Sequence, residues 1–214
     1  YSSHGIHWNK PMTSVRQQNF LLRKEKILAM AETLLLDNNQ DITLSELATE
    51  LDIAKGTIYK HFKSKNQLYL ELIILNETRL LEISQKHNND IKTYVSEYML
   101  YNMLNSNRTI LLHVIEERLT NNERKLKELF EKLYQIREQR IIEIKDMTSD
   151  YLKSLDSAMS IRDYLSYVWT VTYGASLLLN STHYQKSIGS RERLIKLYVN
   201  QALMTPDKIS HAAL

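Results

Sequence analysis

Basic side chains are concentrated in two short segments of the sequence. Residues 53–65 contain four lysines and no acidic residue, a local charge of +4, and residues 1–30 contain five basic residues and one acid, another +4. The whole chain carries only +3, so the remainder is acidic. Clustered basic groups can neutralise the phosphates of a nucleic acid. The alternative is that these lysines only form a solvated face, which would give the same clustering in the sequence. The lysines of the first segment are Lys55, Lys60, Lys63 and Lys65.

The elements that position these side chains are predicted to be helices. The 214 residues include four glycines and two prolines, where average usage gives roughly 15 and 11. The prolines, Pro11 and Pro206, lie near the ends of the chain. A long stretch that lacks proline and is poor in glycine favours helices packed on helices, and it disfavours glycine-rich phosphate loops and β-sandwiches. We therefore expect an all-α fold.

Several classes of site and location are excluded or disfavoured by composition. The chain has no cysteine, which excludes disulfides, thiolate metal sites and cysteine nucleophiles. It has no run of about 18 apolar residues that could span a membrane. A leader-type hydrophobic segment is absent from the N-terminal residues of this sequence, so a cytoplasmic protein without membrane partners is expected.

Apolar periodicity divides the chain into about nine helices. Residues 1–15 are expected to be a flexible tail that could be vector-derived, because the first eleven have no helical period. Residues 16–64 should form a three-helix helix-turn-helix domain, and residues 65–214 a C-terminal helical bundle. The expected helices are 16–37, 43–51, 54–62, 65–85, 90–105, 108–119, 122–153, 160–182 and 190–204.

A helix-turn-helix is the specific expectation for residues 43–62. Thr43 precedes an apolar-periodic run and Glu46 follows three residues later, which is the pattern of a capping box. Asp52 and Ile53 leave room only for a tight turn before a short helix. Ile58 and Phe62 share one face of that helix, four residues apart. Such a unit presents its second helix to a DNA groove.

The same segment resembles the DNA-binding domain of the tetracycline-repressor (TetR/AcrR) family. The resemblance rests on Lys55-Gly56-Thr57-Ile58-Tyr59-Lys60-His61-Phe62, with Lys65 three residues later, and covers roughly residues 22 to 75. It implies a DNA-binding regulator that uses no cofactor. The sequence departs from the family at Asp52, where glycine is frequent, and at Ala54, where a hydroxyl is frequent. Aspartate tolerates a left-handed turn, but alanine cannot cap a helix.

The resemblance also implies which residues contact double-stranded DNA. Thr43, His61 and Lys65 would meet phosphates, and Gly56 would let the backbone approach closely. The side chains of Lys55, Thr57, Tyr59 and Lys60 would face base edges or the sugar-phosphate backbone. Arg16 and Arg23 could reach a minor groove.

The C-terminal half is expected to sense a ligand and to form a homodimer. By resemblance, the helices at 160–182 and 190–204 would pair with their copies in a four-helix bundle. Their broad apolar faces suit this role, although burial within one monomer is the alternative. The residues that make these faces are Val168, Val171, Ala175, Leu178, Leu179, Leu194, Leu197, Tyr198 and Ala202.

Adaptable methionines and aromatic side chains are the candidates for a ligand pocket. Any one of them could equally be an ordinary core residue, and the identity of the small-molecule effector is not readable from the sequence. Glu116, Glu117 and Arg118 could steer a charged ligand but are expected to be solvated. The pocket candidates are Met99, Met103, His113, Phe130, Tyr134, Trp169 and Tyr173.

The expected function is that of a repressor, released from a palindromic operator by a small, largely apolar molecule. Two other functions compete with this interpretation. An enzyme is disfavoured, because the sequence has no nucleophile motif such as G-x-S-x-G. His4 and His7 have a metal-compatible spacing but lie in the tail, so no metal site is expected. A nucleoid-associated or structural DNA-binding protein without an effector is the alternative. A filled C-terminal core would favour that alternative, and an open cavity would favour a sensor.

Overall fold

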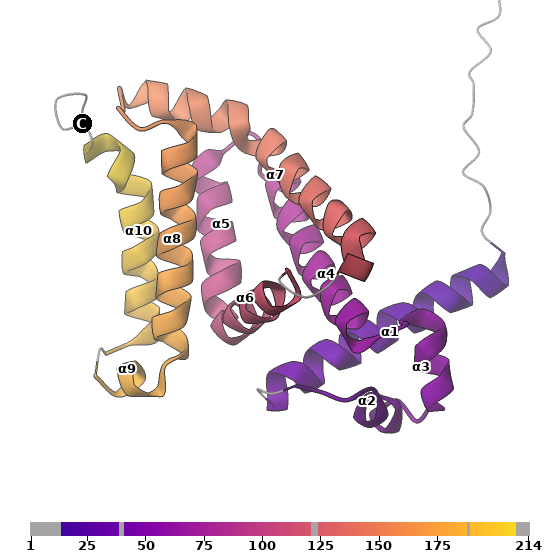
Figure 1. The fold of residues 1–214 in the computed structure, drawn as a ribbon. Coiled ribbons are helices and arrows are strands. Elements are labelled where there is room, and N and C mark those ends of the chain that lie inside the picture. The colour runs from indigo at the N-terminus through magenta and orange to yellow at the C-terminus, as the bar shows by residue number, and fades with distance from the viewer. Residues whose placement is uncertain (1–13, 39–40, 121–123, 188, 209–214) are drawn as a thin grey trace, which may run out of the picture. The chain divides into compact units, whose positions relative to one another are not determined.

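The computed structural model describes residues 14–38, 41–120, 124–187 and 189–208. Every regular element in these residues is a helix (Figure 1), which confirms the all-α prediction. Residues 1–13, most of the predicted tail, lie outside the described residues. The elements are α1 (Val15–Asn38), α2 (Leu44–Glu50), α3 (Lys55–His61), α4 (Lys65–Lys86), α5 (Ile91–Leu104), α6 (Ser106–Thr120), a 3-10 turn (Arg124–Leu126), α7 (Lys127–Ser154), α8 (Ile161–Asn180), α9 (Thr182–Ser187) and α10 (Arg191–Lys208).

Two differences from the expected helices lie near the C-terminus. The short helix α9 occupies the expected polar break after α8, and the side-chain amide of Gln185 secures it by donating to the Leu179 carbonyl at 2.7 Å. Helix α10 continues through Pro206 to Lys208. There the Thr205 hydroxyl donates to the Gln201 carbonyl at 2.7 Å and lies 3.0 Å from the Tyr167 hydroxyl of α8. The contact between Thr205 and Tyr167 joins residues 38 apart in the chain, so it has no signal in the local sequence.

The chain forms two compact units, of which the first ends at Lys65 and the second begins at Asn66. In the first unit, α2 packs against both α1 and α3. Its core consists of side chains that are almost completely buried and come from every helix of the unit. The seven-residue helices α2 and α3 therefore depend on this packing for their stability. The core residues include Ile27, Ala31, Leu35, Ile42, Leu47, Ile58 and Phe62.

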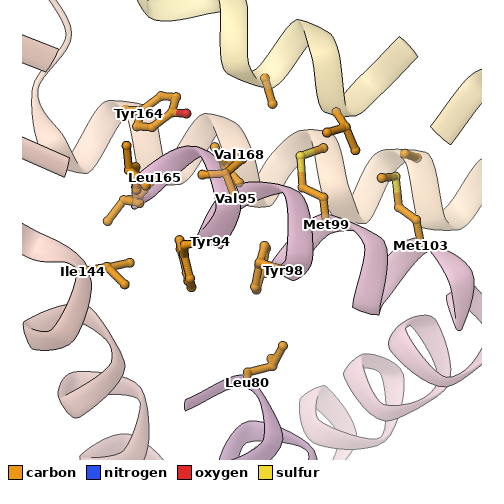
Figure 2. Packing of buried hydrophobic residues seen from close by; sticks show 14 of the residues in the cluster. Leu80, Tyr94, Val95, Tyr98, Met99, Met103, Ile144, Tyr164, Leu165 and Val168 are labelled. Carbon is orange, nitrogen blue, oxygen red and sulfur yellow. The ribbon is translucent and has the colours of Figure 1, made fainter. Parts of the chain in front are cut away.

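The second unit is organised around α5 and α8. Helix α8 packs against α5, α6 and α10, and α5 also contacts α7. Figure 2 shows Tyr94 and Tyr98 on the side of α5 that faces Leu80 and Ile144, and Met99 and Met103 on the side that faces α10. Helix α5 is therefore apolar around most of its circumference, as expected of a helix inside a bundle.

The apolar face of α8 is largely used within the monomer. Val168, Ala175 and Leu179 are buried in the core of the second unit, and so is Ala202 of α10. The expectation that these four side chains form a pairing surface is therefore wrong, because α5 and the α8–α10 contact already cover them. Exposed apolar side chains remain on the same helices at Leu177, Leu197 and Met204.

Arg191 joins three helix ends. Its Nη1 donates to the Leu179 carbonyl of α8 at 3.0 Å, and its Nη2 donates to the Met103 carbonyl of α5 at 2.8 Å. Nη2 also lies 3.2 Å from the Ser106 hydroxyl at the start of α6. The last carbonyls of a helix lack intrahelical partners, so one guanidinium at the start of α10 satisfies the C-terminal ends of two helices.

Candidate functional site

The turn between α2 and α3 is built by local hydrogen bonds. The Thr43 hydroxyl accepts from the Glu46 backbone N–H at 3.1 Å, and the Glu46 carboxylate accepts from the Thr43 backbone N–H at 2.7 Å. This confirms the predicted capping box. Hydrogen bonds to the Glu46 carboxylate, from the Thr43 backbone first and its side chain second, lower the pKa of Glu46 below its ordinary value. The pair fixes where α2 begins.

Asp52 and Ala54 shape the turn that leads into α3. Asp52 has φ of 50°, in the left-handed region that glycine prefers, so this departure from the family pattern is accommodated. The Ile53 backbone N–H donates to the Ala48 carbonyl at 3.0 Å and closes the turn. Ala54 is the N-cap of α3 and makes no side-chain cap hydrogen bond. The N-terminal end of α3 therefore has no side-chain cap of its own.

Helix α3 has a buried face and an exposed face. Ile58 and the following Phe62 are completely buried, which orients the helix on the core of the first unit. The opposite face presents lysines, an aromatic ring that is 47% exposed and a glycine with open space where a Cβ would stand. Thr57 is half-buried. The exposed residues of this face are Lys55, Gly56, Tyr59 and Lys60.

His61 and Lys65, two further predicted phosphate contacts, are engaged within the first unit. The imidazole of His61 stacks on Phe20 of α1 with 4.1 Å between ring centroids. Burial, followed by the nearby charges of Arg23 and Lys24, lowers the pKa of His61. The Lys65 ammonium lies 2.8 Å from the Asp41 carboxylate. A neutral imidazole and a paired ammonium attract phosphate less than the exposed lysines of α3 do.

A cavity of about 630 Å³ lies in the second unit, among α4, α5, α6, α7 and α8. Its wall combines aromatic and aliphatic side chains with five that are charged. This size and mixture are typical of small-molecule sites. The lining residues include Glu77, Leu80, Tyr98, Ile110, His113, Glu116, Glu117, Arg137, Arg140, Trp169 and Tyr173.

Arg137 organises the charged part of this wall. Its guanidinium donates to the Glu116 carboxylate at 2.6 and 2.8 Å, and to Oε1 of Glu77 at 3.0 and 3.1 Å. Burial by itself would lower the pKa of Arg137, but the hydrogen bonds and charges of Glu116 and Glu77 raise it above its ordinary value. Arg137 therefore stays charged and holds α4, α6 and α7 together.

Arg140, one turn further along α7, has far fewer partners. Its side chain is 7% exposed, and its closest acid is Glu77, with Nη2 3.5 Å from Oε2. Its guanidinium carbon lies 5.6 Å from the ring centre of Tyr98 and 5.8 Å from that of Trp169. Within the described part of the chain, Nε and Nη1 are buried and have no hydrogen-bond partner.

The tyrosines around Arg140 are also strongly affected by burial. Burial raises the pKa of Tyr98, and the neighbouring carboxylate of Glu77 adds to the effect while Arg140 opposes it. Burial likewise raises the pKa of Tyr94, whose hydroxyl is buried without a hydrogen-bond partner among the described residues. These hydroxyls stay protonated at neutral pH, so they can act as hydrogen-bond donors.

The predicted pocket residues divide into three groups. His113, Trp169 and Tyr173 line the cavity, and the rings of His113 and Tyr173 meet edge to face at 5.2 Å. Met99 and Met103 are completely buried in the hydrophobic core. Phe130 and Tyr134 stack on each other along α7, with Tyr134 51% exposed.

Sequence reasoning missed the charged residues of the cavity. Glu77, Arg137 and Arg140 were not candidates, and the expectation that Glu116 is solvated is wrong, since its side chain is 15% exposed and bound to Arg137. The available signal was the place of Glu77 on the apolar face of α4, four residues after Ile73 and three before Leu80. A charge on an apolar face indicates a buried pair or a functional group.

In residues 14–38, 41–120, 124–187 and 189–208, no group of three or more His, Cys, Asp or Glu side chains is placed to hold a metal ion. His4 and His7 lie outside the described residues. Of the helices described here, none combines the length and apolar character needed to cross a membrane.

The helix-turn-helix and the fold both have known counterparts. Residues 27–72 match the family of bacterial regulatory proteins, tetR family. The chain is 34% identical over 82 residues to the HTH-type transcriptional regulator QacR of Staphylococcus aureus, strain Mu50; this segment covers 38% of the chain and 44% of that protein.

A solved structure extends the likeness beyond the first unit. The crystal structure of a bacterial regulatory protein in the tetR family from Rhodococcus RHA1 matches 86% of this chain and 96% of its own, with a TM-score of 0.65 and 17% identity. At this identity the match concerns the fold. Residues 27–72, which include the helix-turn-helix, thus carry a domain of the tetR family of bacterial regulatory proteins, and the chain as a whole has the fold of a protein of that family.

Proposed function

We propose that this protein is a ligand-responsive transcriptional regulator, most simply a repressor that binds a palindromic operator as a homodimer. The observation that carries the proposal is the exposed face of α3, where Lys55, Tyr59 and Lys60 stand on a helix fixed by Ile58 and Phe62. Lysines supply affinity for phosphates, and a helix in the major groove reads base edges. The DNA-binding unit would correspond to residues 16–64, and the sensing and dimerisation unit to residues 65–214.

Individual contacts follow from the position of each side chain. Lys55 and Lys60 are exposed and would meet the phosphate backbone. Thr57 and Tyr59 would contact base edges or a thymine methyl. Gly56 has open space beside it, which permits a close approach of the backbone to DNA. Thr43 would meet a phosphate at the start of α2.

A second copy of the chain would dock on the exposed side of α8 and α10. Leu177 is 58% exposed and Leu197 is 49% exposed, and both are large apolar side chains. A surface groove beside them is lined by Tyr167, Val171 and Tyr198, among others. Two copies related by a two-fold axis would present two α3 helices to half-sites about one DNA turn apart.

A small, largely apolar effector would occupy the cavity of the second unit. Helix α4 begins at Lys65, where the first unit ends, and contributes Glu77 and Leu80 to the cavity wall. A ligand that displaces α4 would change the spacing of the two α3 helices and release the DNA. A hundredfold preference for the released state corresponds to about 2.7 kcal/mol.

The experiment is selection of duplexes from a random-sequence pool, followed by affinity measurements on the selected site. We expect enrichment of a two-fold symmetric sequence and a strong dependence of affinity on salt. Enrichment of no sequence would contradict the proposal. A small-molecule library is then screened for thermal stabilisation, and each stabilising compound is tested for release of the selected duplex.

A structural DNA-binding protein without an effector is the second candidate function. The cavity favours a sensor over this alternative, because its wall combines apolar side chains with the charged Arg137 and Arg140, a mixture typical of small-molecule sites. If compounds bind the second unit tightly and leave DNA affinity unchanged, the structural alternative is preferred.

A further inference from the structure

We propose that the cavity recognises a molecule with an apolar body and a carboxylate group, and that Arg140 is the residue that binds the carboxylate. This inference rests on the proposed function, because it specifies the chemical class of the effector. It concerns one side chain of the cavity wall and four observations around it.

The first observation is the absence of hydrogen bonds at a buried charge. Arg140 is a cavity-lining residue with 7% of its side chain exposed. Its Nε and Nη1 are buried without an acceptor anywhere in the described residues. A buried donor without a partner is costly, and the cost is larger for a charged group. An acceptor supplied by a ligand would remove that cost.

The second observation is that the nearby acid is already engaged. Glu77 binds Arg137 through Oε1 at 3.0 and 3.1 Å, whereas its Oε2 lies 3.5 Å from Nη2 of Arg140. Oε2 makes no hydrogen bond to any described residue. Glu116 also binds Arg137, at 2.6 and 2.8 Å. Arg137 therefore binds three of the four oxygens of these carboxylates, and Arg140 faces only the fourth, Oε2 of Glu77.

The third observation is the placement of aromatic rings around the guanidinium. Tyr98 and Trp169 lie 5.6 and 5.8 Å from its central carbon, close enough for cation–π attraction. Rings stabilise the charge of Arg140 but offer no acceptor in its plane. A carboxylate has two oxygens that match the paired N–H groups of Nη2 with either Nη1 or Nε, so it can supply an acceptor to a nitrogen that the rings leave unsatisfied.

The fourth observation concerns the rest of the wall, which suits an apolar body. Leu80, Ile110, Ile141 and Leu177 line the same cavity of about 630 Å³. A cavity of this volume has room for a molecule that is much larger than a bare carboxylate group. The polar end and the apolar body thus have separate places in one cavity.

A cationic ligand is the opposite possibility, and the ion pairs argue against it. Three of the four oxygens of Glu77 and Glu116 bind Arg137, so a cation at these oxygens would compete with a guanidinium held by four hydrogen bonds. The fourth oxygen, Oε2 of Glu77, lies 3.5 Å from Nη2 of Arg140, so a cation there would be repelled by the charge of Arg140. Glu117 is exposed at the wall and has an interaction of its own. The described structure therefore leaves donors unsatisfied at Arg140, and a cation would not satisfy them.

The test uses the fluorescence of Trp169, which lies beside Arg140. The chain has two tryptophans, so a Trp8→Phe background makes Trp169 the reporter of the cavity. The probes are 2-naphthoate and 4-phenylbutyrate, each compared with the primary ammonium compound of the same skeleton, 2-naphthylmethylamine and 4-phenylbutylamine. We expect saturable changes with the carboxylates and affinities about tenfold or more weaker for the ammonium compounds.

Variants assign the effect to Arg140. Arg140→Met should weaken carboxylate binding by about 10- to 100-fold, whereas Lys145→Met, which removes an exposed cation from the same helix, should leave it unchanged. Arg140→Lys keeps the charge in case the methionine variant does not fold, and should also lose affinity because an ammonium lacks the paired N–H groups. Circular dichroism verifies that each variant is helical.

Three results would overturn the inference: ammonium probes that bind as tightly as the carboxylates, no response of Trp169 to either carboxylate, or wild-type carboxylate affinity in a folded Arg140 variant. The titrations use protein without DNA, so they are independent of the regulatory role. Carboxylate binding by a protein that selects no DNA sequence would uphold this inference and overturn the proposed function. Sequence-specific DNA binding without carboxylate binding would overturn this inference and uphold the DNA-binding part of the proposed function.

Discussion

The imidazole ring of His61 lies against the ring of Phe20, with centroids 4.1 Å apart and planes inclined by 28°. The contact joins the last residue of α3 to α1, and Nδ1 of His61 is buried there without a hydrogen-bond partner among the described residues. A histidine that resembled a phosphate ligand in the sequence is thus part of the packing that orients α3.

This stack predicts a pH dependence of stability. Burial, then Arg23 and Lys24, lowers the pKa of His61 below its ordinary value of 6.5. The unfolded chain therefore binds the proton more readily, so this residue's contribution is present above about pH 6.5 and is lost as pH falls through the lowered pKa. Thermal unfolding from pH 7.5 to 5 should show a smaller decline in His61→Phe than in the wild type. His183→Gln, at an exposed histidine of α9, is the control and should retain the wild-type slope.

Substitutions on α3 should distinguish side chains that provide affinity for any DNA from side chains that provide preference for one sequence. Lys60→Ala should weaken binding to the selected duplex and to random DNA alike and reduce the salt slope by about one. Tyr59→Ala should instead reduce the ratio between the two affinities. Lys65→Ala should have a smaller effect than Lys60→Ala, because Lys65 is paired with Asp41 at 2.8 Å. Equal losses on both DNAs for Lys60→Ala and Tyr59→Ala would contradict these assignments.

Arg137 should be a major contributor to the stability of the second unit. Arg137→Met leaves Glu77 and Glu116, with side chains 7% and 15% exposed, without their principal partner. Removing one member of a buried ion network typically costs about 3 kcal/mol or more. Urea unfolding should report that loss, and the exposed Lys145→Met on the same helix should differ little from the wild type. A loss no larger than that of the control would show that the network contributes little.

Arg191 should stabilise the junction of α5, α8 and α10. Arg191→Ala removes hydrogen bonds to the carbonyls of Leu179 and Met103, and we expect a loss of about 2 kcal/mol in the free energy of unfolding. Arg193→Ala, two residues later on an exposed position, is the matched control. Hydrogen exchange should locate the effect at the C-terminal ends of α5 and α8; an effect spread evenly over the chain would refute the assignment.

The exposed side of α10 should determine the oligomeric state. Leu197 is 49% exposed, and Leu197→Glu would bury a charge in the proposed dimer, so sedimentation should show monomers. Ile142→Glu, at an exposed apolar residue of α7, should leave the dimer intact. Ala175→Arg is unsuited to this test, because Ala175 is 3% exposed within the monomer core. A Leu197→Glu protein that remains dimeric would exclude this surface.

The helix-turn-helix could be predicted because its signals are local. Thr43 and Glu46 are three residues apart and bind each other, and Asp52 supplies the left-handed conformation of the turn. Ile58 and Phe62 repeat at the helical period and are both buried. These features depend on backbone geometry within a few residues, so the sequence by itself determined the helices and the face of α3.

The polar interior of the second unit was decided by the tertiary structure. Glu77 and Arg137 are 60 residues apart in the chain, and Glu116 and Arg137 are 21 apart. On helices rich in Lys and Glu, the sequence does not distinguish a charged residue that becomes buried from one that stays solvated. The periodicity of the apolar residues indicates which side of a helix is apolar, but not which neighbouring helix covers that side. Only the packing of α4, α6 and α7 brings these charges together, and only the packing of α5 and α8 against α7 places the rings of Tyr98 and Trp169 beside Arg140.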